Sequence, residues 1–435
     1  MDEFKNYILK CKKFDEIYDI RWKLHIGRKI NKYHYKDINI GLVNLECGGY
    51  GDIIKCIKFY RYLKDWYPGI KITILSMSQK KFRELGIKTK IINLKNVDGI
   101  DDECPEIKDL RVVGNKQKFN LFFLIPVIED PFKINDFKKL IPYANKWNTF
   151  SINEYNDYNS KYIDFPIGIG DKNLGLFLEN NDKIKKQNLI KNPYALVYIQ
   201  SSEDGMLHSR YCFLSFLEMI INKNKKHNIL EFVIPNWIEE DILYYRPVRS
   251  KFLNITKQQF NKITLVNKKE KIQLISDKIR TKNKKYNKKE LIMRADILPL
   301  SKDKFKSLIN DSINDILLTG DESFVDTLNC CNKKTIWYQI APWKENLARS
   351  LSLETGNKNY KSYKTSCGII KGFKFKNDIQ KLIKNNDFRI KGRERLDSII
   401  IGFYENTMNP DIQKMIDIIE HSRYLHTLKN KIKNM

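Results

Sequence analysis

Apolar stretches alternate with amphipathic stretches along the first third of the chain, and this pattern predicts strands that are each followed by a helix. The predicted strands are residues 38–45, 70–75, 90–94 and 119–125, and the predicted helices are residues 53–64 and 82–85. Tyr67-Pro68-Gly69 ends the first helix, because proline and glycine disfavour another helical turn. Strands alternating with helices indicate parallel βαβ units, so we expect an α/β domain here.

A second alternation of the same kind begins at Tyr194–Gln200 and extends through most of the remaining chain. Its predicted strands are residues 194–200, 230–235, 263–266, 295–298, 315–319 and 335–339, and its predicted helices are residues 213–221, 302–309, 321–330 and 343–351. Residues 268–289 are rich in lysine and are predicted to form an exposed excursion. Residues 142–192, rich in Tyr, Asn, Asp and Gly, are typical of loops and of a connection between domains.

The length of 435 residues is large for one hydrophobic core, so two domains are expected. We assign residues 1–37 to an N-terminal extension, 38–175 to a Rossmann-like domain, 190–374 to a second Rossmann-like domain, and 375–435 to a helical tail. The predicted fold class is therefore α/β, with two Rossmann-like domains facing a cleft and with C-terminal helices.

The formal net charge of +27 comes mostly from lysines that are spread along the whole chain. Strongly basic proteins bind nucleic acid, anionic membrane surfaces, or acidic small molecules such as sugar nucleotides. A nucleic-acid footprint would show clustered arginine with interleaved aromatic residues. We therefore interpret the lysine excess as mostly solvated surface, and a nucleic-acid-binding protein is kept as a third, less favoured hypothesis.

The eight cysteines include no C-x-x-C pair and no histidine at zinc-ligand spacing, which favours reduced thiols and no metal site. The N-terminal segment is charged throughout and shows no secretory signal. No run of eighteen apolar residues occurs, so no membrane span is expected. These patterns predict a soluble, cytoplasmic protein.

A glycine-rich turn, Gly48-Gly49-Tyr50-Gly51-Asp52, follows the first predicted strand. Glycine lets backbone N–H groups approach a ligand closely, so Gly49 and Gly51 are candidate binding residues. The spacing differs from G-x-G-x-x-G, and no P-loop GK[ST] follows. Two interpretations of Asp52 stay open: a helix N-cap, or a general base in the crevice at the carboxyl ends of parallel strands.

A second turn of this kind, Gly320-Asp321-Glu322-Ser323, lies where a predicted strand meets a predicted helix. Backbone N–H groups and Ser323 at the helix start are suited to phosphate, and Asp321 or Glu322 to sugar hydroxyls. Plain helix capping by Asp321 or Ser323 is the alternative.

Two further segments carry candidate donor-binding residues. Ser201, Ser202 and Arg210 follow the first strand of the second domain and would suit a diphosphate, although an ordinary polar loop explains them slightly better. In Thr335–Lys344, Gln339 is a candidate partner for the edge of a nucleobase, whereas Trp337 is better explained as core packing.

The two glycine–acid turns together resemble those of GT-B glycosyltransferases, in particular the lipopolysaccharide heptosyltransferases and the similar arginine rhamnosyltransferases. In those families the acid after the first glycine loop is the general base on the acceptor, a role that the resemblance gives to Asp52. Their second domain binds the nucleotide sugar at a G-D/E-x-S-like turn, which matches Gly320–Ser323. Their terminal helix crosses back onto the first domain, so the resemblance implies the same for the tail.

The chain departs from the heptosyltransferases at the start of the second domain, where their lysine-containing phosphate loop is replaced by Ser201, Ser202 and Arg210. Its Lys- and Asn-rich composition also resembles that of proteins from giant viruses that infect amoebae, which would place it in host cytoplasm or a virion.

The sequence thus predicts a metal-independent, inverting glycosyltransferase that needs no cofactor beyond its nucleotide-sugar donor. Its acceptor would be a glycan, a lipid-linked sugar or a protein. The alternative from another class is a non-catalytic binding or structural protein, associated with a virion, on a degenerate transferase fold.

Overall fold

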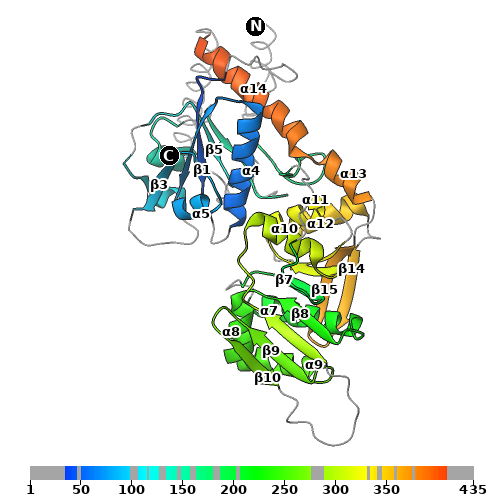
Figure 1. The fold of residues 1–435 in the computed structure, drawn as a ribbon. Coiled ribbons are helices and arrows are strands. Elements are labelled where there is room, and N and C mark those ends of the chain that lie inside the picture. The colour runs from blue at the N-terminus through cyan, green and yellow to red at the C-terminus, as the bar shows by residue number, and fades with distance from the viewer. Residues whose placement is uncertain are drawn as a thin grey trace, which may run out of the picture. The chain divides into compact units, whose positions relative to one another are not determined.

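A computed structural model describes residues 35–46, 50–97, 106–114, 117–126, 134–144, 148–156, 163–179, 187–201, 206–275, 289–330, 334–339, 345–356, 360–374 and 378–408. The chain divides into two compact units (Figure 1). Unit 1 comprises Met1–Glu154, Asn159–Pro166 and Phe388–Met435, and unit 2 comprises Tyr155–Tyr158 and Ile167–Asp387. Residues 167–175 and 378–385 therefore group with unit 2, whereas the sequence analysis placed them in the first domain and in the tail.

Unit 1 is built on a six-stranded sheet in the order β4-β3-β2-β1-β5-β6. The strands are β1 (Asn39–Asn44), β2 (Lys71–Ser76), β3 (Ile91–Asn96), β4 (Leu110–Val112), β5 (Leu121–Leu124) and β6 (Thr149–Ser151). The helical elements are α4 (Gly51–Trp66), α5 (Gln79–Glu84), η1 (Ile107–Asp109), α6 (Ile134–Leu140) and α14 (Phe388–Met408). All neighbouring strands are parallel except β4, which pairs antiparallel with β3 at the edge.

An aromatic cluster joins α14 to the rest of unit 1, where Figure 1 shows α4 and α14 side by side. The fully buried ring of Phe388 lies 6.2 Å from that of Phe59 and is stacked 5.9 Å from Tyr62 and 6.2 Å from Trp66. The Tyr67 hydroxyl also donates a hydrogen bond to Asp397 at 2.6 Å. The last described helix thus completes the core of a unit that begins at the other end of the chain.

Unit 2 is built on a nine-stranded sheet in the order β10-β9-β11-β8-β7-β12-β13-β15-β14. The strands are β7 (Tyr194–Tyr198), β8 (Ile229–Val233), β9 (Lys262–Val266), β10 (Lys271–Ile275), β11 (Glu290–Arg294), β12 (Asp315–Leu318), β13 (Thr335–Tyr338), β14 (Tyr360–Thr365) and β15 (Gly368–Lys374). The helices are α7 (Met206–Lys223), α8 (Asn236–Tyr244), α9 (Arg246–Thr256), α10 (Lys302–Asp311), α11 (Asp321–Cys330), α12 (Glu345–Thr355) and α13 (Asp378–Asn385). The strands from β9 to β13 in sheet order are parallel, and the antiparallel strands lie at the two edges.

The predicted α/β fold class with two Rossmann-like units is confirmed, and so are the predicted strands between residues 38 and 125. The strand predicted at residues 295–298 is wrong, because β11 occupies Glu290–Arg294 instead. Its apolar run is only Leu291–Met293, and the charged Glu290 and Arg294 at its two ends make the strand hard to recognise from the sequence. The sequence analysis also missed α8, α9 and the β14–β15 hairpin.

None of the described helices combines the length and the apolar character that crossing a membrane requires.

Candidate functional site

Each unit has a topological switch point, where two neighbouring strands connect to strands on opposite sides of the sheet. In unit 1 this switch lies between β1 and β5, and in unit 2 it lies between β7 and β12. Ligands of open α/β sheets bind outside the carboxyl ends of the strands at such switch points. The polar residues at these two strand ends are therefore the candidate site residues.

In unit 1, Asn44 holds the switch point together. Its side chain is fully buried, and its Nδ2 donates to the carbonyl oxygen of Ile125 at 2.7 Å and to that of Asp52 at 3.2 Å. These bonds link the end of β1 to the start of α4 and to the end of β5. Its Oδ1 has no hydrogen-bond partner among the residues that the structure describes.

Asp52 lies inside the first turn of α4, whereas Tyr50 occupies the N-cap position without a side-chain cap. The N-cap interpretation of Asp52 is therefore wrong. Its carboxylate lies 3.8 Å from the ammonium group of Lys55, whose side chain is only 2% exposed, and Lys55 also contacts Glu154 at 3.4 Å. A buried cation thus lies beside two carboxylates, and an acid in the first helical turn is stabilised by the helix dipole.

Of the glycines in the first glycine turn, the structure describes only Gly51. Gly48 and Gly49 lie outside the described residues. Gly51 is the first residue of α4, and a Cβ placed on it would meet no described atom within 4 Å. Among the described residues, none occupies the space into which a Gly51 side chain would point.

In unit 2, Thr319 and Gln339 connect the ends of β7, β12 and β13. The backbone N–H of Gln200 donates to Thr319 Oγ1 at 3.2 Å, and that hydroxyl donates in turn to Oε1 of Gln339. The Nε2 of Gln339 donates to Oγ of the fully buried Ser209 on α7. Gln339 is only 3% exposed, and its side chain links the end of β13 to Thr319 and to α7 below the switch point.

The two acids at the start of α11 are bonded to tyrosines. Asp321 accepts a hydrogen bond from the Tyr338 hydroxyl, and Glu322 accepts one from the Tyr155 hydroxyl at 2.7 Å. Both carboxylates are buried. If they bind sugar hydroxyls as predicted, they must do so through the carboxylate oxygens that do not accept from the tyrosines. Glu322 is only 3% exposed, so little of its carboxylate is accessible to a ligand.

Ser323 differs from these acids, because its hydroxyl lies next to Gly320 at the start of α11. A Cβ added to Gly320 would lie 3.4 Å from Oγ of Ser323. The hydroxyl is thus placed at the helix N-terminus, where backbone N–H groups lack helical partners and an anion is favoured.

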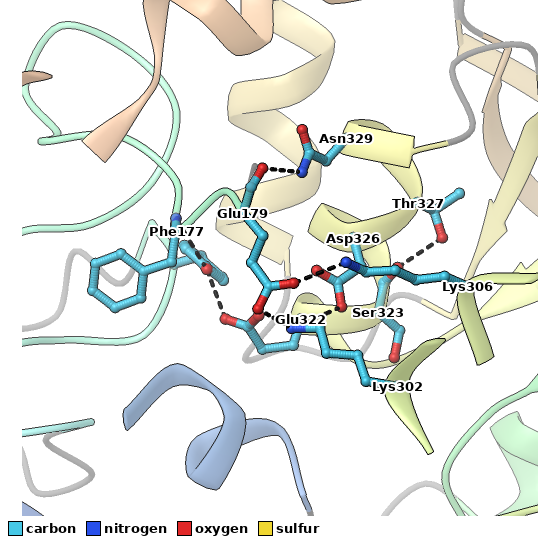
Figure 2. Close-up of polar contacts among 10 residues, drawn as sticks. Phe177, Glu179, Lys302, Lys306, Glu322, Ser323, Asp326, Thr327 and Asn329 are labelled. Atoms are coloured by element: carbon cyan, nitrogen blue, oxygen red, sulfur yellow. Dashed lines mark hydrogen bonds and ion pairs between the residues drawn. The ribbon is translucent and has the colours of Figure 1, made fainter. Parts of the chain in front are cut away.

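Glu179 is held by two lysines of α10, as Figure 2 shows. Lys302 lies 2.7 Å from one carboxylate oxygen and Lys306 lies 2.8 Å from the other, and Asn329 donates to the Glu179 carbonyl at 3.0 Å. Burial raises the pKa of this carboxyl, but the two lysines outweigh burial and lower the pKa to about 2. The cluster joins α10, α11 and the chain before residue 180.

Stability should therefore depend on the ionisation of Glu179. Because its pKa falls from 4.5 to about 2 on folding, its contribution is present above about pH 4.5 and is lost as the pH falls towards 2. We expect Glu179→Gln to lower the free energy of unfolding by up to about 3 kcal/mol at pH 7 and by less near pH 3. Urea unfolding at both pH values measures the difference. The control Glu345→Gln removes an exposed carboxylate paired with Arg349 and should change the free energy of unfolding by less than about 1 kcal/mol. An equal effect for both variants would contradict the assignment.

The predicted diphosphate contacts of the first βα turn of unit 2 are only partly described. Ser202 lies outside the described residues, and Ser201 is exposed at the end of the segment after β7. Arg210 forms a bidentate ion pair with Asp241, with distances of 2.6 and 2.9 Å, and its guanidinium lies 4.1 Å from the centre of the Tyr245 ring. The guanidinium is thus engaged in joining α7 to α8.

Sequence reasoning missed several residues that shape these two switch points, namely Asn44, Lys55, Glu154, Tyr155 and Ser209. Asn44, a lone amide closing an apolar strand, and Lys55, on the same helical face as Asp52, were detectable signals. Within the described ranges no group of three or more His, Cys, Asp or Glu side chains is arranged to hold a metal ion.

No protein-family model matches the chain, and no curated protein matches it in sequence. Among solved structures, one titled trehalose-6-phosphate synthase, OtsA, is 10% identical with a TM-score of 0.23, over 80% of this chain and 72% of that chain. An OtsA apo structure is also 10% identical, with a TM-score of 0.22 over 82% of this chain and 76% of its own. Scores this low leave the function to be inferred from the residues of the chain itself.

Proposed function

We propose that the protein is a glycosyltransferase that moves a sugar from a nucleotide-sugar donor to an acceptor nucleophile. The observation that supports it best is that one chain contains two parallel α/β units, each with its own switch point and buried polar side chains at the strand ends. Such a pair supplies one crevice for each of two substrates. We assign acceptor activation to unit 1 and donor binding to unit 2.

In the proposed reaction Asp52 removes the proton from the acceptor hydroxyl as its oxygen attacks the anomeric carbon. The bond from that carbon to the diphosphate oxygen breaks, and its electron pair leaves with the nucleoside diphosphate. Direct displacement inverts the anomeric configuration. Lys55 holds the carboxylate of Asp52 in place, because its buried ammonium group lies 3.8 Å away.

On the donor side, the start of α11 is assigned to the leaving diphosphate through its backbone N–H groups and the Ser323 hydroxyl. Ser201 is retained as a further donor contact. Gln339 and Thr319 shape this site, since their side chains are bonded to each other and to neighbouring elements. No metal is required by this assignment.

A thermal-shift screen of the full chain against nucleoside diphosphates and nucleotide sugars tests donor binding. We expect at least one nucleotide to raise the melting temperature, because a ligand that binds only the folded form stabilises it by RT ln(1 + [L]/Kd). Isothermal titration of that nucleotide then gives the affinity. If no nucleotide binds, the transferase assignment is wrong and the non-catalytic alternative is favoured.

Gly51→Ala tests whether a substrate occupies the open space beside α4. The added methyl group meets no described atom, and alanine favours helix over glycine, so the melting temperature should stay equal or rise. If the acceptor lies against this turn, its KM should increase about tenfold while donor affinity stays unchanged, which steady-state kinetics would show. Gly86→Ala, likewise open but at a φ of +81°, is a control away from the turn that should lower stability and leave KM unchanged. An unaltered acceptor KM in Gly51→Ala would place the acceptor elsewhere.

A further inference from the structure

Three helices of unit 2 bring exposed tyrosines and basic residues together at the surface. The tyrosine–arginine face comprises Tyr211 on α7, Tyr244 at the end of α8, Tyr245, and Arg246, Arg249 and Lys251 on α9. Tyr244 is 81% exposed and Tyr211 is 40% exposed. Large exposed side chains of this kind are common at interaction surfaces, because aromatic rings otherwise tend to be buried.

Contacts among the helices hold two rings of this face, those of Tyr211 and Tyr245. The Lys251 ammonium lies 4.5 Å from the centre of the Tyr211 ring, and the Arg210 guanidinium lies 4.1 Å from that of Tyr245. Arg249 donates to the carbonyl oxygen of Leu243 at 3.0 Å, which joins α9 to the end of α8. A partner would therefore meet rings whose positions are already set, so little side-chain entropy would be lost on binding.

The charge of the face is positive and remains available. Arg246, Arg249 and Lys251 are exposed, and no carboxylate within the described part of the chain lies within 4 Å of their charged groups. The nearby Asp241 is neutralised by its ion pair with Arg210. Arginine is also scarce in this chain, since the basic residues are mainly lysine, yet Arg210, Arg246 and Arg249 occur together here.

We propose that the tyrosine–arginine face binds single-stranded nucleic acid. Aromatic rings stack on bases without regard to sequence, and neighbouring cations contact the phosphates of the same strand. The segment from Tyr244 to Lys251 thus has the clustered arginine and interleaved aromatic residues that the lysine-rich surface elsewhere lacks. This inference does not depend on the proposed transferase activity.

Fluorescence anisotropy of the full chain with a labelled oligothymidylate tests the proposal. The variant Tyr211→Ala/Tyr244→Ala should weaken binding about tenfold or more, and Tyr244→Phe should not, because the ring is kept. The variant Arg246→Ala/Lys251→Ala should also weaken binding and reduce the slope of log affinity against log salt by about 1 to 2. The matched control Lys364→Ala/Lys371→Ala removes the same charge from exposed positions on β14 and β15 and should have little effect.

Three results would overturn the proposal. They are absence of binding at low salt, an equal loss of affinity in the control variant, and displacement of the oligonucleotide by phosphatidylserine vesicles with the same dependence on these residues. Excess nucleoside diphosphate should leave the oligonucleotide bound, and its displacement would instead place the strand in the donor site. Melting temperatures of the variants, which change only exposed side chains, should equal that of the parent chain.

Discussion

Replacement of Asp52 by asparagine should slow sugar transfer about 10²- to 10⁴-fold while donor affinity is unchanged. The amide has the shape of the carboxylate but cannot accept the acceptor's proton. Asp52 lies in the first turn of α4, beside the open space at Gly51 and next to the buried Lys55. The loss should fall on kcat, since the proton moves only as the new bond forms. Single-turnover kinetics together with isothermal titration of the donor would separate chemistry from binding.

Glu154 provides the matched control for this variant. It contacts the same lysine at 3.4 Å, but its side chain is 34% exposed and comes from the segment after β6. Glu154→Gln should therefore disturb the Lys55 ion pair without removing the base, and turnover should fall by less than tenfold. Equal losses in both variants would show that charge balance around Lys55 matters rather than proton abstraction. Normal turnover in Asp52→Asn would refute the role of Asp52.

Replacement of Asn156 by alanine should lower the free energy of unfolding of unit 2 by about 2–4 kcal/mol. Asn156 is fully buried, and its Oδ1 accepts from the backbone N–H of Ile169 at 2.9 Å. Its Nδ2 donates to the Ile169 carbonyl and to the Ser350 hydroxyl, each at 2.9 Å. Alanine would leave the Ile169 N–H without its acceptor. It would also hold a left-handed backbone, with φ of 57°, that asparagine tolerates better.

Two further variants divide this loss into its causes. Asn156→Gly removes the same hydrogen bonds but adopts the positive φ freely, so it should be about 1 kcal/mol more stable than Asn156→Ala. Ser350→Ala removes one partner on α12 and should cost about 1 kcal/mol. Urea unfolding measures all three variants. If Asn156→Ala were as stable as the parent chain, these hydrogen bonds of Asn156 would not stabilise unit 2.

The sequence predicted the fold better than it predicted its edges. Apolar runs such as residues 38–45 and 119–125 become strands because burial on both faces of a parallel sheet requires them to be apolar throughout. The β14–β15 hairpin has an exposed, lysine-containing edge, so its pattern does not separate it from a loop. α8 and α9 were missed because the chain between β8 and β9 is divided at Tyr245 into two short helices.

The sequence predicts the two glycine turns of the candidate site but not the residues that support them. Asp52 and Ser323 follow strand ends within the local sequence, so their neighbourhood could be inferred from the turn alone. Tyr155 reaches Glu322, and Ser209 reaches Gln339, only after the chain has folded. Partners separated by more than a hundred residues leave no local pattern. Arg210 and Asp241 are only 31 residues apart, but they lie on different helices, so their ion pair left no local pattern either.

The segment order of unit 1 also determines when each unit can be completed during synthesis. All segments of unit 2 have left the ribosome once Asp387 has emerged, whereas the core of unit 1 still lacks Phe388 and the helix behind it. The aromatic side of α4, with Tyr62 and Trp66, therefore waits without its stacking partner while the whole of unit 2 is translated. Apolar surface exposed for that interval is what chaperones recognise on nascent chains. Nascent unit 1 is accordingly the expected chaperone client, and unit 2 is the part of the polypeptide that reaches its native core first.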